Sequence, residues 1–100
     1  MAQRESRLSR KIMDELRLMG VFCFKVHGSA VMMAGLPDIV CCVNGRFVGF
    51  ETKVPENAGG ATARQLYVHD LIRKAGGVVH IVTSVNQAID IIESLTLRDD

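Results

Sequence analysis

Hydrophobic residues recur at helical spacing in the first part of the chain. From Gln3 to Met19 the apolar side chains follow one another at steps of four, four and three, at Leu8, Ile12, Leu16 and Met19. This spacing predicts an amphipathic helix, which Gly20 ends. Continuing the same stripe one step toward the N-terminus places Glu5 on the buried face, near the start of the helix.

Short apolar runs rich in Val, Ile, Phe and Cys follow, and they are typical of strands. Val21–Val26 is the first of these runs, with glycines near both ends. Two more runs flank the pair Asn44-Gly45, whose residues accept the positive φ angles of a type I′ turn. The pattern therefore predicts one strand, a loop over residues 27–36, and a β-hairpin with a two-residue turn.

The predicted turn also fixes which side chains of the hairpin face one another. Counting outward from it places Asp38 opposite Glu51, and directly opposed side chains share a face with Cβ atoms roughly 4.5–5.5 Å apart. Lys53 emerges on the same face as Glu51, whereas Thr52 points to the other face. We therefore expect Asp38, Glu51 and Lys53 to form one cluster.

Two close carboxylates repel each other unless they share a proton or bind a cation. Their hard oxygen atoms favour Mg²⁺ or Mn²⁺. A neighbouring lysine can offset charge on a phosphate or position a water molecule. The alternative interpretation is a solvated strand end at which Glu51 and Lys53 form a weak surface ion pair.

The second half of the chain alternates loop, helix, strand and helix signals. Residues 54–61 contain Pro and Gly-Gly, which mark a mobile connection. Thr62 and Gln65 have the spacing of a capping box, which opens a helix that runs to about Ala75. The residues expected on its apolar side are Leu66, Leu71, Ile72 and Ala75.

A strongly β-branched run, Val78–Thr83, predicts a last strand, parallel to the hairpin strand that precedes the linking helix. Ser84 and Gln87 form a second capping-box pattern, and residues 97–100 are expected to fray. The apolar face of the last helix is expected at Val85, Ala88, Ile89, Ile92 and Leu95. The predicted order is α-β-β-β-α-β-α, an α/β fold with a mixed central sheet flanked by helices.

Composition indicates one globular domain, residues 1–100, with a formal charge of +1 that says little about partners. Three cysteines without metal-ligand spacing, Cys23, Cys41 and Cys42, are expected to be reduced packing residues in strands. No apolar run approaches the ~20 residues of a membrane span, and the polar start lacks a signal-peptide core. We expect a cytoplasmic protein without membrane contact.

The segment Gly35-Leu-Pro-Asp-Ile39, the segment Phe50-Glu-Thr-Lys53 and the later Gln65 resemble one known family. Pro37-Asp38 followed by Glu51-Thr52-Lys53 is similar to the PD-(D/E)XK nuclease motif. The residues that flank this motif resemble those of the VRR-NUC branch of that superfamily. A bare Pro-Asp and Glu-x-Lys would be weak evidence, but here they lie on a predicted hairpin. The resemblance covers nearly the whole chain and implies the restriction-endonuclease-like core.

The resemblance adds two residues to the predicted site. In VRR-NUC proteins a glutamate of the N-terminal helix completes the metal site, with an apolar position three residues on, as in Glu5 and Leu8. A glutamine after the catalytic strand, here Gln65, borders the metal. From the residues alone, Glu5 is equally explained by the helix dipole and Gln65 by capping. Glu15 is the weaker candidate for the helix glutamate.

Candidate nucleic-acid contacts are fewer and less specific. The resemblance places Lys25 and His27 near the active site, where each could meet a phosphate, although a lone histidine is more often structural. Ser29 in the following loop and Arg64 are further candidates, and Tyr67 and His69 are weaker ones. The basic residues of the first helix could contact phosphates or form a solvated face. This last set comprises Arg4, Arg7, Arg10, Lys11 and Arg17.

By resemblance, the chain is expected to be an Mg²⁺- or Mn²⁺-dependent DNA endonuclease of the stand-alone phage or bacterial type. Asp38 and Glu51 would hold the metal, with the Thr52 carbonyl and Glu5 as further ligands, and Lys53 would orient or activate water. Such proteins are associated with homodimers that cut branched or four-way-junction DNA in the bacterial cytoplasm. The alternatives are a catalytically weak nucleic-acid-binding module of the same fold and a small regulatory or assembly protein.

Overall fold

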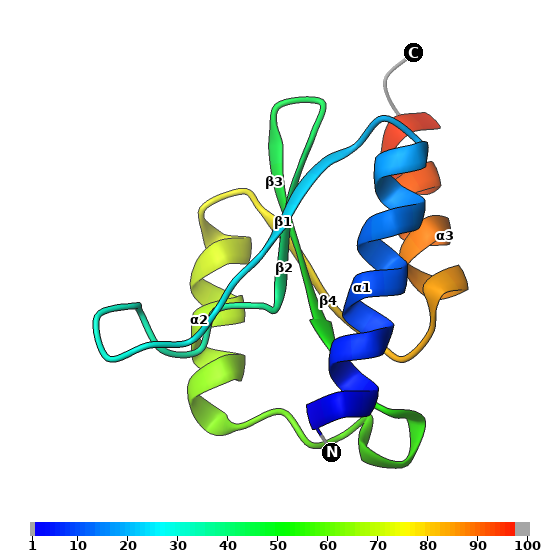
Figure 1. Ribbon diagram of the computed structural model, residues 1–100. Helices are drawn as coiled ribbons and strands as arrows, with labels where there is room; N and C mark the ends of the chain where they lie inside the picture. The colour runs from blue at the N-terminus through cyan, green and yellow to red at the C-terminus, as the bar shows by residue number, and fades with distance from the viewer. Residues whose placement is uncertain (1, 98–100) are drawn as a thin grey trace.

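A mixed four-stranded sheet forms the middle layer of the protein (Figure 1). The computed structural model describes residues 2–97, so the predicted fraying at 98–100 lies outside the described residues. The elements are α1 (Ala2–Leu18), β1 (Phe22–Lys25), β2 (Ile39–Val43), β3 (Arg46–Thr52), the 3₁₀ turn η1 (Pro55–Asn57), α2 (Ala63–Lys74), β4 (Val78–Val82) and α3 (Val85–Thr96). Their order and the mixed sheet confirm the predicted fold.

The hairpin forms in the predicted register. Asn44 and Gly45 have φ angles of 52° and 78°, as a type I′ turn requires. The antiparallel β2–β3 ladder runs from the pair next to the turn out to Ile39 and Phe50. β4 then pairs with β3 in parallel, and β1 pairs with β2 antiparallel. The start of β2, next to Asp38, and the end of β3, which carries Glu51, therefore lie at the same end of the sheet.

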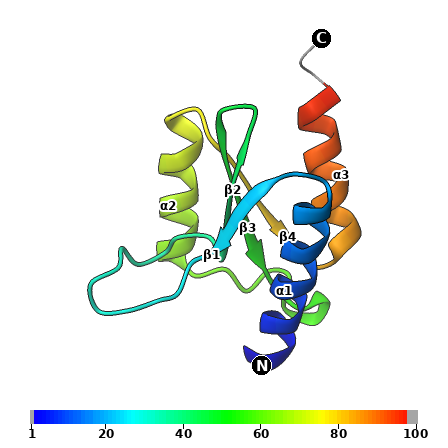
Figure 2. The same ribbon diagram turned by 45° about the horizontal axis from the view of Figure 1, so that its top comes forward.

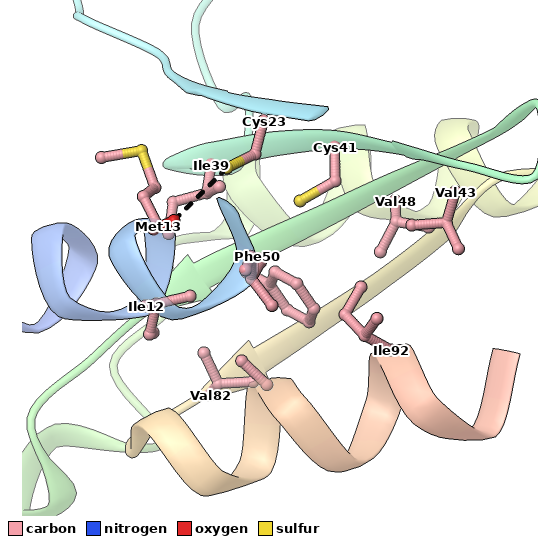
Figure 3. Close-up of a cluster of buried hydrophobic side chains, with 12 residues drawn as sticks. Ile12, Met13, Cys23, Ile39, Cys41, Val43, Val48, Phe50, Val82 and Ile92 are labelled. Atoms are coloured by element: carbon pink, nitrogen blue, oxygen red, sulfur yellow. Dashed lines mark hydrogen bonds between the residues drawn. The ribbon is translucent and has the colours of Figure 1, made fainter. Parts of the chain in front are cut away.

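The main hydrophobic core lies between the sheet and the helices α1 and α3 (Figures 1 and 3). Ile12 and Leu16 of α1, Phe50 of β3 and Ile92 of α3 are completely buried there. Removing side chains of this size from water stabilises the fold by about 1.5–3 kcal/mol each. α2 covers the other face of the sheet, as both views show (Figures 1 and 2).

The predicted apolar side of α2 is wrong. The structure buries Val68 and His69, whereas Leu66 and Leu71 are 51% and 39% exposed. The reason is a close approach of the 27–36 loop: a Cβ at Gly35, which has φ 89°, would lie 2.9 Å from Val68 Cγ2. This contact turns the Val68 face inward. His69 is fully buried and its pKa is lowered by burial, so it does not make the substrate contact considered above.

Two apolar residues are more exposed than the pattern predicted. Met19 follows the end of α1 and is 41% exposed. Cys42 is free and exposed, whereas Cys23 and Cys41 are free, buried and paired across β1 and β2. Cys42 lies on the sheet face opposite the core, so only two of the three cysteines are packing residues.

The capping signals of the two later helices hold in part. Thr62 and Gln65 form the complete reciprocal box at the start of α2. At α3, the Ser84 side chain accepts a hydrogen bond from the Gln87 amide, but Gln87 Oε1 accepts from the Thr83 amide instead of closing the box on Ser84. No helix within residues 2–97 has both the length and the apolar character needed to cross a bilayer.

Candidate active site

Glu51 is a carboxylate buried at the end of β3, with 2% of the residue exposed. Its Oε2 accepts a hydrogen bond from Gln65 Nε2 at 3.0 Å and lies 3.6 Å from the Lys53 ammonium. Its Oε1 is buried and has no hydrogen-bond partner among the described residues. Burial, followed by the charge of Asp38, raises the pKa of Glu51 to about 7, and Lys53 opposes this shift.

Asp38 lies just before β2 and bonds to Thr52, the last residue of β3. Its Oδ2 accepts hydrogen bonds from the Thr52 amide at 2.8 Å and from the Thr52 hydroxyl at 2.7 Å. Its carbonyl accepts from the Val26 amide at 2.7 Å. The β2–β3 ladder ends at the pair Ile39 and Phe50, one residue before the predicted pair of Asp38 and Glu51. The Asp38 carboxylate bonds to Thr52 instead of lying directly opposite the Glu51 side chain. Its charge nevertheless acts on Glu51.

Glu51 and Thr52 face opposite sides of the sheet, as the alternation of a strand requires. Glu51 contacts Gln65 of α2, whereas the Thr52 hydroxyl lies 2.9 Å from the buried Ser9 hydroxyl of α1. Lys53, which is 8% exposed, lies on the Glu51 side. The candidate residues thus form two adjoining clusters. Glu51, Lys53 and Gln65 lie toward α2, and Asp38 bonds to Thr52, which bonds to Ser9 of α1.

Gln65 combines the two functions considered from the sequence. Its Oε1 accepts from the Thr62 amide at 2.8 Å and caps α2, while its Nε2 donates to Glu51. The cap therefore fixes the amide that orients the Glu51 carboxylate. Because both contacts come from one side chain, the start of α2 is tied directly to the end of β3.

Glu5 is half-buried in α1, and it does not join the other carboxylates in one compact cluster. Its charge makes only the last and smallest contribution to the raised pKa of Glu51. Within residues 2–97, no three side chains of the His, Cys, Asp and Glu types converge closely enough to hold a metal ion. Glu5, Asp38 and Glu51 therefore do not form a ready-made three-carboxylate site.

The candidate nucleic-acid residues occupy three different environments. Lys25 donates to Ser9 Oγ at 3.3 Å, and His27 is exposed at the end of β1. Ser29 accepts a hydrogen bond from the Val31 amide, and it lines a cavity of about 260 Å³ together with Asp38. Arg64 donates to a loop carbonyl and its guanidinium lies 5.6 Å from the ring centre of Tyr67.

Ser9 is a site residue that the sequence analysis missed. It is 1% exposed and bonds to Thr52, the residue that holds Asp38. Its signal was present in the helical spacing, because Ser9 lies four residues after Glu5 and four before the buried Met13. A stripe defined by apolar residues alone does not include a polar residue on the same helix face.

The donor set fits a hard divalent cation. Glu51 Oε1 is a buried acceptor that lacks a hydrogen bond, and Asp38 Oδ1 receives none from residues 2–97. A divalent ion near these oxygens would relieve both the desolvation of Glu51 and its repulsion by Asp38. Mg²⁺ is often held by only one or two carboxylates, with water and substrate phosphates completing its shell.

Comparison with known proteins supports the resemblance that the motif indicates. A solved structure described as a VRR_NUC domain matches with a TM-score of 0.73 and 27% identity, over 89% of this chain and 94% of that chain. The Hjc Holliday junction resolvase of Archaeoglobus fulgidus matches with a TM-score of 0.50 and 20% identity, over 76% of this chain and 64% of that chain. No family model and no curated protein matches the sequence. Together with the Pro-Asp and Glu-x-Lys motif on this fold, these matches support a nuclease of the VRR-NUC and PD-(D/E)XK type.

Proposed function

We propose that this protein is a metal-dependent nuclease that hydrolyses phosphodiester bonds in DNA. The observation that carries the proposal is the buried Glu51 carboxylate, with one oxygen unpartnered and the other beside Lys53, at a sheet end shared with Asp38. A carboxylate buried in this way is costly unless a ligand or the chemistry uses it. The structural match to a VRR_NUC domain supports a nuclease function.

In this proposal Asp38 and Glu51 hold Mg²⁺ or Mn²⁺, and the Thr52 carbonyl and Glu5 are further ligands. When bound, such an ion stabilises charge on phosphoryl oxygens and lowers the pKa of a bound water. Among residues 2–97 Glu5 does not form a three-residue metal-ligand cluster with Asp38 and Glu51, so as a ligand it would act together with water or substrate oxygens. Lys53 supplies a buried positive charge on the Glu51 side, where it orients the attacking water, and Gln65 keeps the Glu51 carboxylate in place.

We propose branched DNA, including four-way junctions, as the preferred substrate. The support is the family resemblance and the fold shared with an archaeal Holliday junction resolvase. A homodimer would suit such DNA, because a two-fold axis places equivalent sites on equivalent arms. Phe22, Cys42 and Phe47 form an exposed row across three strands, and this apolar surface is available to a second copy. The protein would act in the bacterial cytoplasm.

The experiment that tests the proposal is a cleavage panel. Purified protein is incubated with linear, nicked, forked and four-way DNA in Mg²⁺, Mn²⁺ or EDTA. We expect product only with metal, more product from branched DNA, and loss of product in Asp38→Asn. The matched control is Asp14→Asn, which changes an exposed carboxylate on α1. Retardation of DNA without cleavage would instead support a binding module of the same fold.

A further inference from the structure

A pocket between α1 and β1 has no part in the proposed metal site. It has a volume of about 280 Å³. α1 and β1 pack side by side along this edge of the sheet (Figure 2). The pocket is lined by Ser6, Ser9, Arg10, Met13, Lys25 and His27. Its lining thus contains an arginine, a lysine, a histidine and two hydroxyls, but no carboxylate.

The cations of this pocket have no anionic partner in the described part of the chain. The ion pairs found within residues 2–97 join Arg4 to Glu56, Lys53 to Glu51 and Lys74 to Asp70. Arg10 and Lys25 take part in none of them. Two cations without a carboxylate, beside the exposed Ser6 hydroxyl, form a donor-rich environment that suits a phosphate group.

One wall of the pocket connects to Asp38 through a directed chain of hydrogen bonds. The Thr52 hydroxyl donates its single proton to Asp38 Oδ2, so the bond between the Ser9 and Thr52 hydroxyls must be donated by Ser9. Ser9 in turn accepts from the Lys25 ammonium. The chain therefore runs from Lys25 in the pocket to the carboxylate of the candidate metal site, with every donor oriented the same way.

We infer that this pocket binds a phosphodiester group of the DNA backbone, next to the bond that is cut, through Arg10, Lys25 and the Ser6 hydroxyl. The inference rests on the proposed nuclease function and adds a binding subsite to it. A phosphate here would be held by charge-assisted hydrogen bonds. Because Lys25 also bonds to Ser9, an occupied pocket would fix the hydrogen-bond chain that positions Asp38.

The test measures DNA binding without turnover. The full chain is titrated against fluorescent four-way and duplex DNA in EDTA, and anisotropy is recorded at several salt concentrations. Arg10→Gln and Lys25→Gln are compared with Lys74→Gln, which removes the same charge from an exposed side chain on α2. We expect the pocket variants to bind about fivefold or more weakly and to lower the slope of log affinity against log salt by about 1. Lys74→Gln should follow the wild type.

Pocket variants whose affinity and salt slope match those of Lys74→Gln would overturn the inference. A second readout uses inorganic phosphate as the probe and nuclear magnetic resonance of the labelled chain in EDTA. We expect saturable shifts at the Ser9 and Arg10 amides that are lost in Lys25→Gln. Shifts that persist in that variant also count against the subsite, and phosphate binding with an unchanged DNA salt slope would overturn the DNA contact.

The outcome for the subsite is separable from the outcome for the nuclease. If the wild type cuts DNA but the pocket variants bind DNA as tightly as Lys74→Gln, only the inferred phosphate subsite is contradicted. If the pocket variants lose affinity as expected but the wild type never cuts DNA in Mg²⁺ or Mn²⁺, only the nuclease proposal falls. Thermal unfolding of each variant checks that the fold is retained; Gln at position 25 can still donate to Ser9.

Discussion

Glu51 is a carboxylate whose burial opposes folding in the absence of a cation. Its pKa is raised from 4.5 to about 7, so the folded protein holds this proton over a pH range in which the unfolded chain has released it. The stability contributed by this residue is therefore lost as the pH rises from 4.5 to about 7. One pKa unit corresponds to about 1.4 kcal/mol, so the cost above pH 7 is about 3 kcal/mol.

We expect Glu51→Gln to stabilise the metal-free protein at pH 8, by up to about 3 kcal/mol, and to have little effect at pH 4.5. Urea denaturation at the two pH values measures the difference. Glu93→Gln, which changes an exposed glutamate on α3, is the control. Added Mg²⁺ should stabilise the wild type but not Glu51→Gln, because only the wild type keeps the proposed ligand. Equal stabilisation of both would contradict the assignment of Glu51.

The Thr52 hydroxyl links Asp38 to Ser9 of α1, because it donates to the Asp38 carboxylate and bonds to the Ser9 hydroxyl. In Thr52→Val the shape is kept but the buried Ser9 hydroxyl loses its partner, so we expect a loss of about 1–3 kcal/mol in unfolding free energy. Mn²⁺ affinity, measured by calorimetry, should also fall because Asp38 loses one of its two donors. Thr52→Ser keeps the hydroxyl and should retain both properties. Unchanged Mn²⁺ affinity in Thr52→Val would separate Asp38 from the hydrogen-bond chain.

Among the secondary-structure elements, the hairpin was the most predictable part of the fold. The Asn44-Gly45 turn and the alternation of side chains determine which residues share a face, and these are local properties of the sequence. The tilt of the Asp38 carboxylate toward Thr52 was not predictable, because it occurs where the ladder ends. Here side-chain hydrogen bonds, and not strand pairing, decide the geometry.

The orientation of α2 was predicted wrongly for a tertiary reason. Its sequence has no clear apolar stripe, so packing against the 27–36 loop and the sheet selects the Val68 face. The same limitation hid Ser9, since a polar residue on a buried helix face is explained only by its partner on another element. The role of Gln65 as both cap and Glu51 donor likewise required the contact between α2 and β3.

Gly49 allows the segment before β2 to approach β3 closely. A Cβ at this position would lie 2.5 Å from Pro37 Cγ. We therefore expect Gly49→Ala to displace Pro37 and the adjoining Asp38, to destabilise the fold by about 1–3 kcal/mol, and to reduce cleavage. Gly59→Ala is the matched control, because a Cβ at Gly59 meets no atom within 4 Å. The check is unfolding free energy together with cleavage rate; a Gly49→Ala protein that behaves like Gly59→Ala would contradict this packing argument.

For the molecule as a whole, the exposed sheet face is the feature that bears on assembly. Phe22 is 66% exposed and Phe24 is 46% exposed, with ring centres 6.0 Å apart. Patches of this kind on a small domain commonly mark interaction surfaces. We expect a dimer by light scattering coupled to size-exclusion chromatography, and a monomer for Phe22→Ser. Leu97→Ser, at the exposed end of α3, is the control. A monomeric wild type at all concentrations would contradict the dimer.

The nuclease proposal depends on Asp38 and Glu51 acting in chemistry and not only in structure. The most direct measurement is the single-turnover cleavage rate of the best DNA substrate in Mg²⁺ or Mn²⁺, for the wild type, Asp38→Asn and Asp14→Asn, at protein concentrations that saturate binding. We predict that Asp38→Asn lowers the rate by about a hundredfold or more, the loss typical of removing an electrostatic contributor to the transition state, while Asp14→Asn leaves it unchanged. Equal rates for the wild type and Asp38→Asn, or wild-type cleavage that persists in EDTA, would contradict the account.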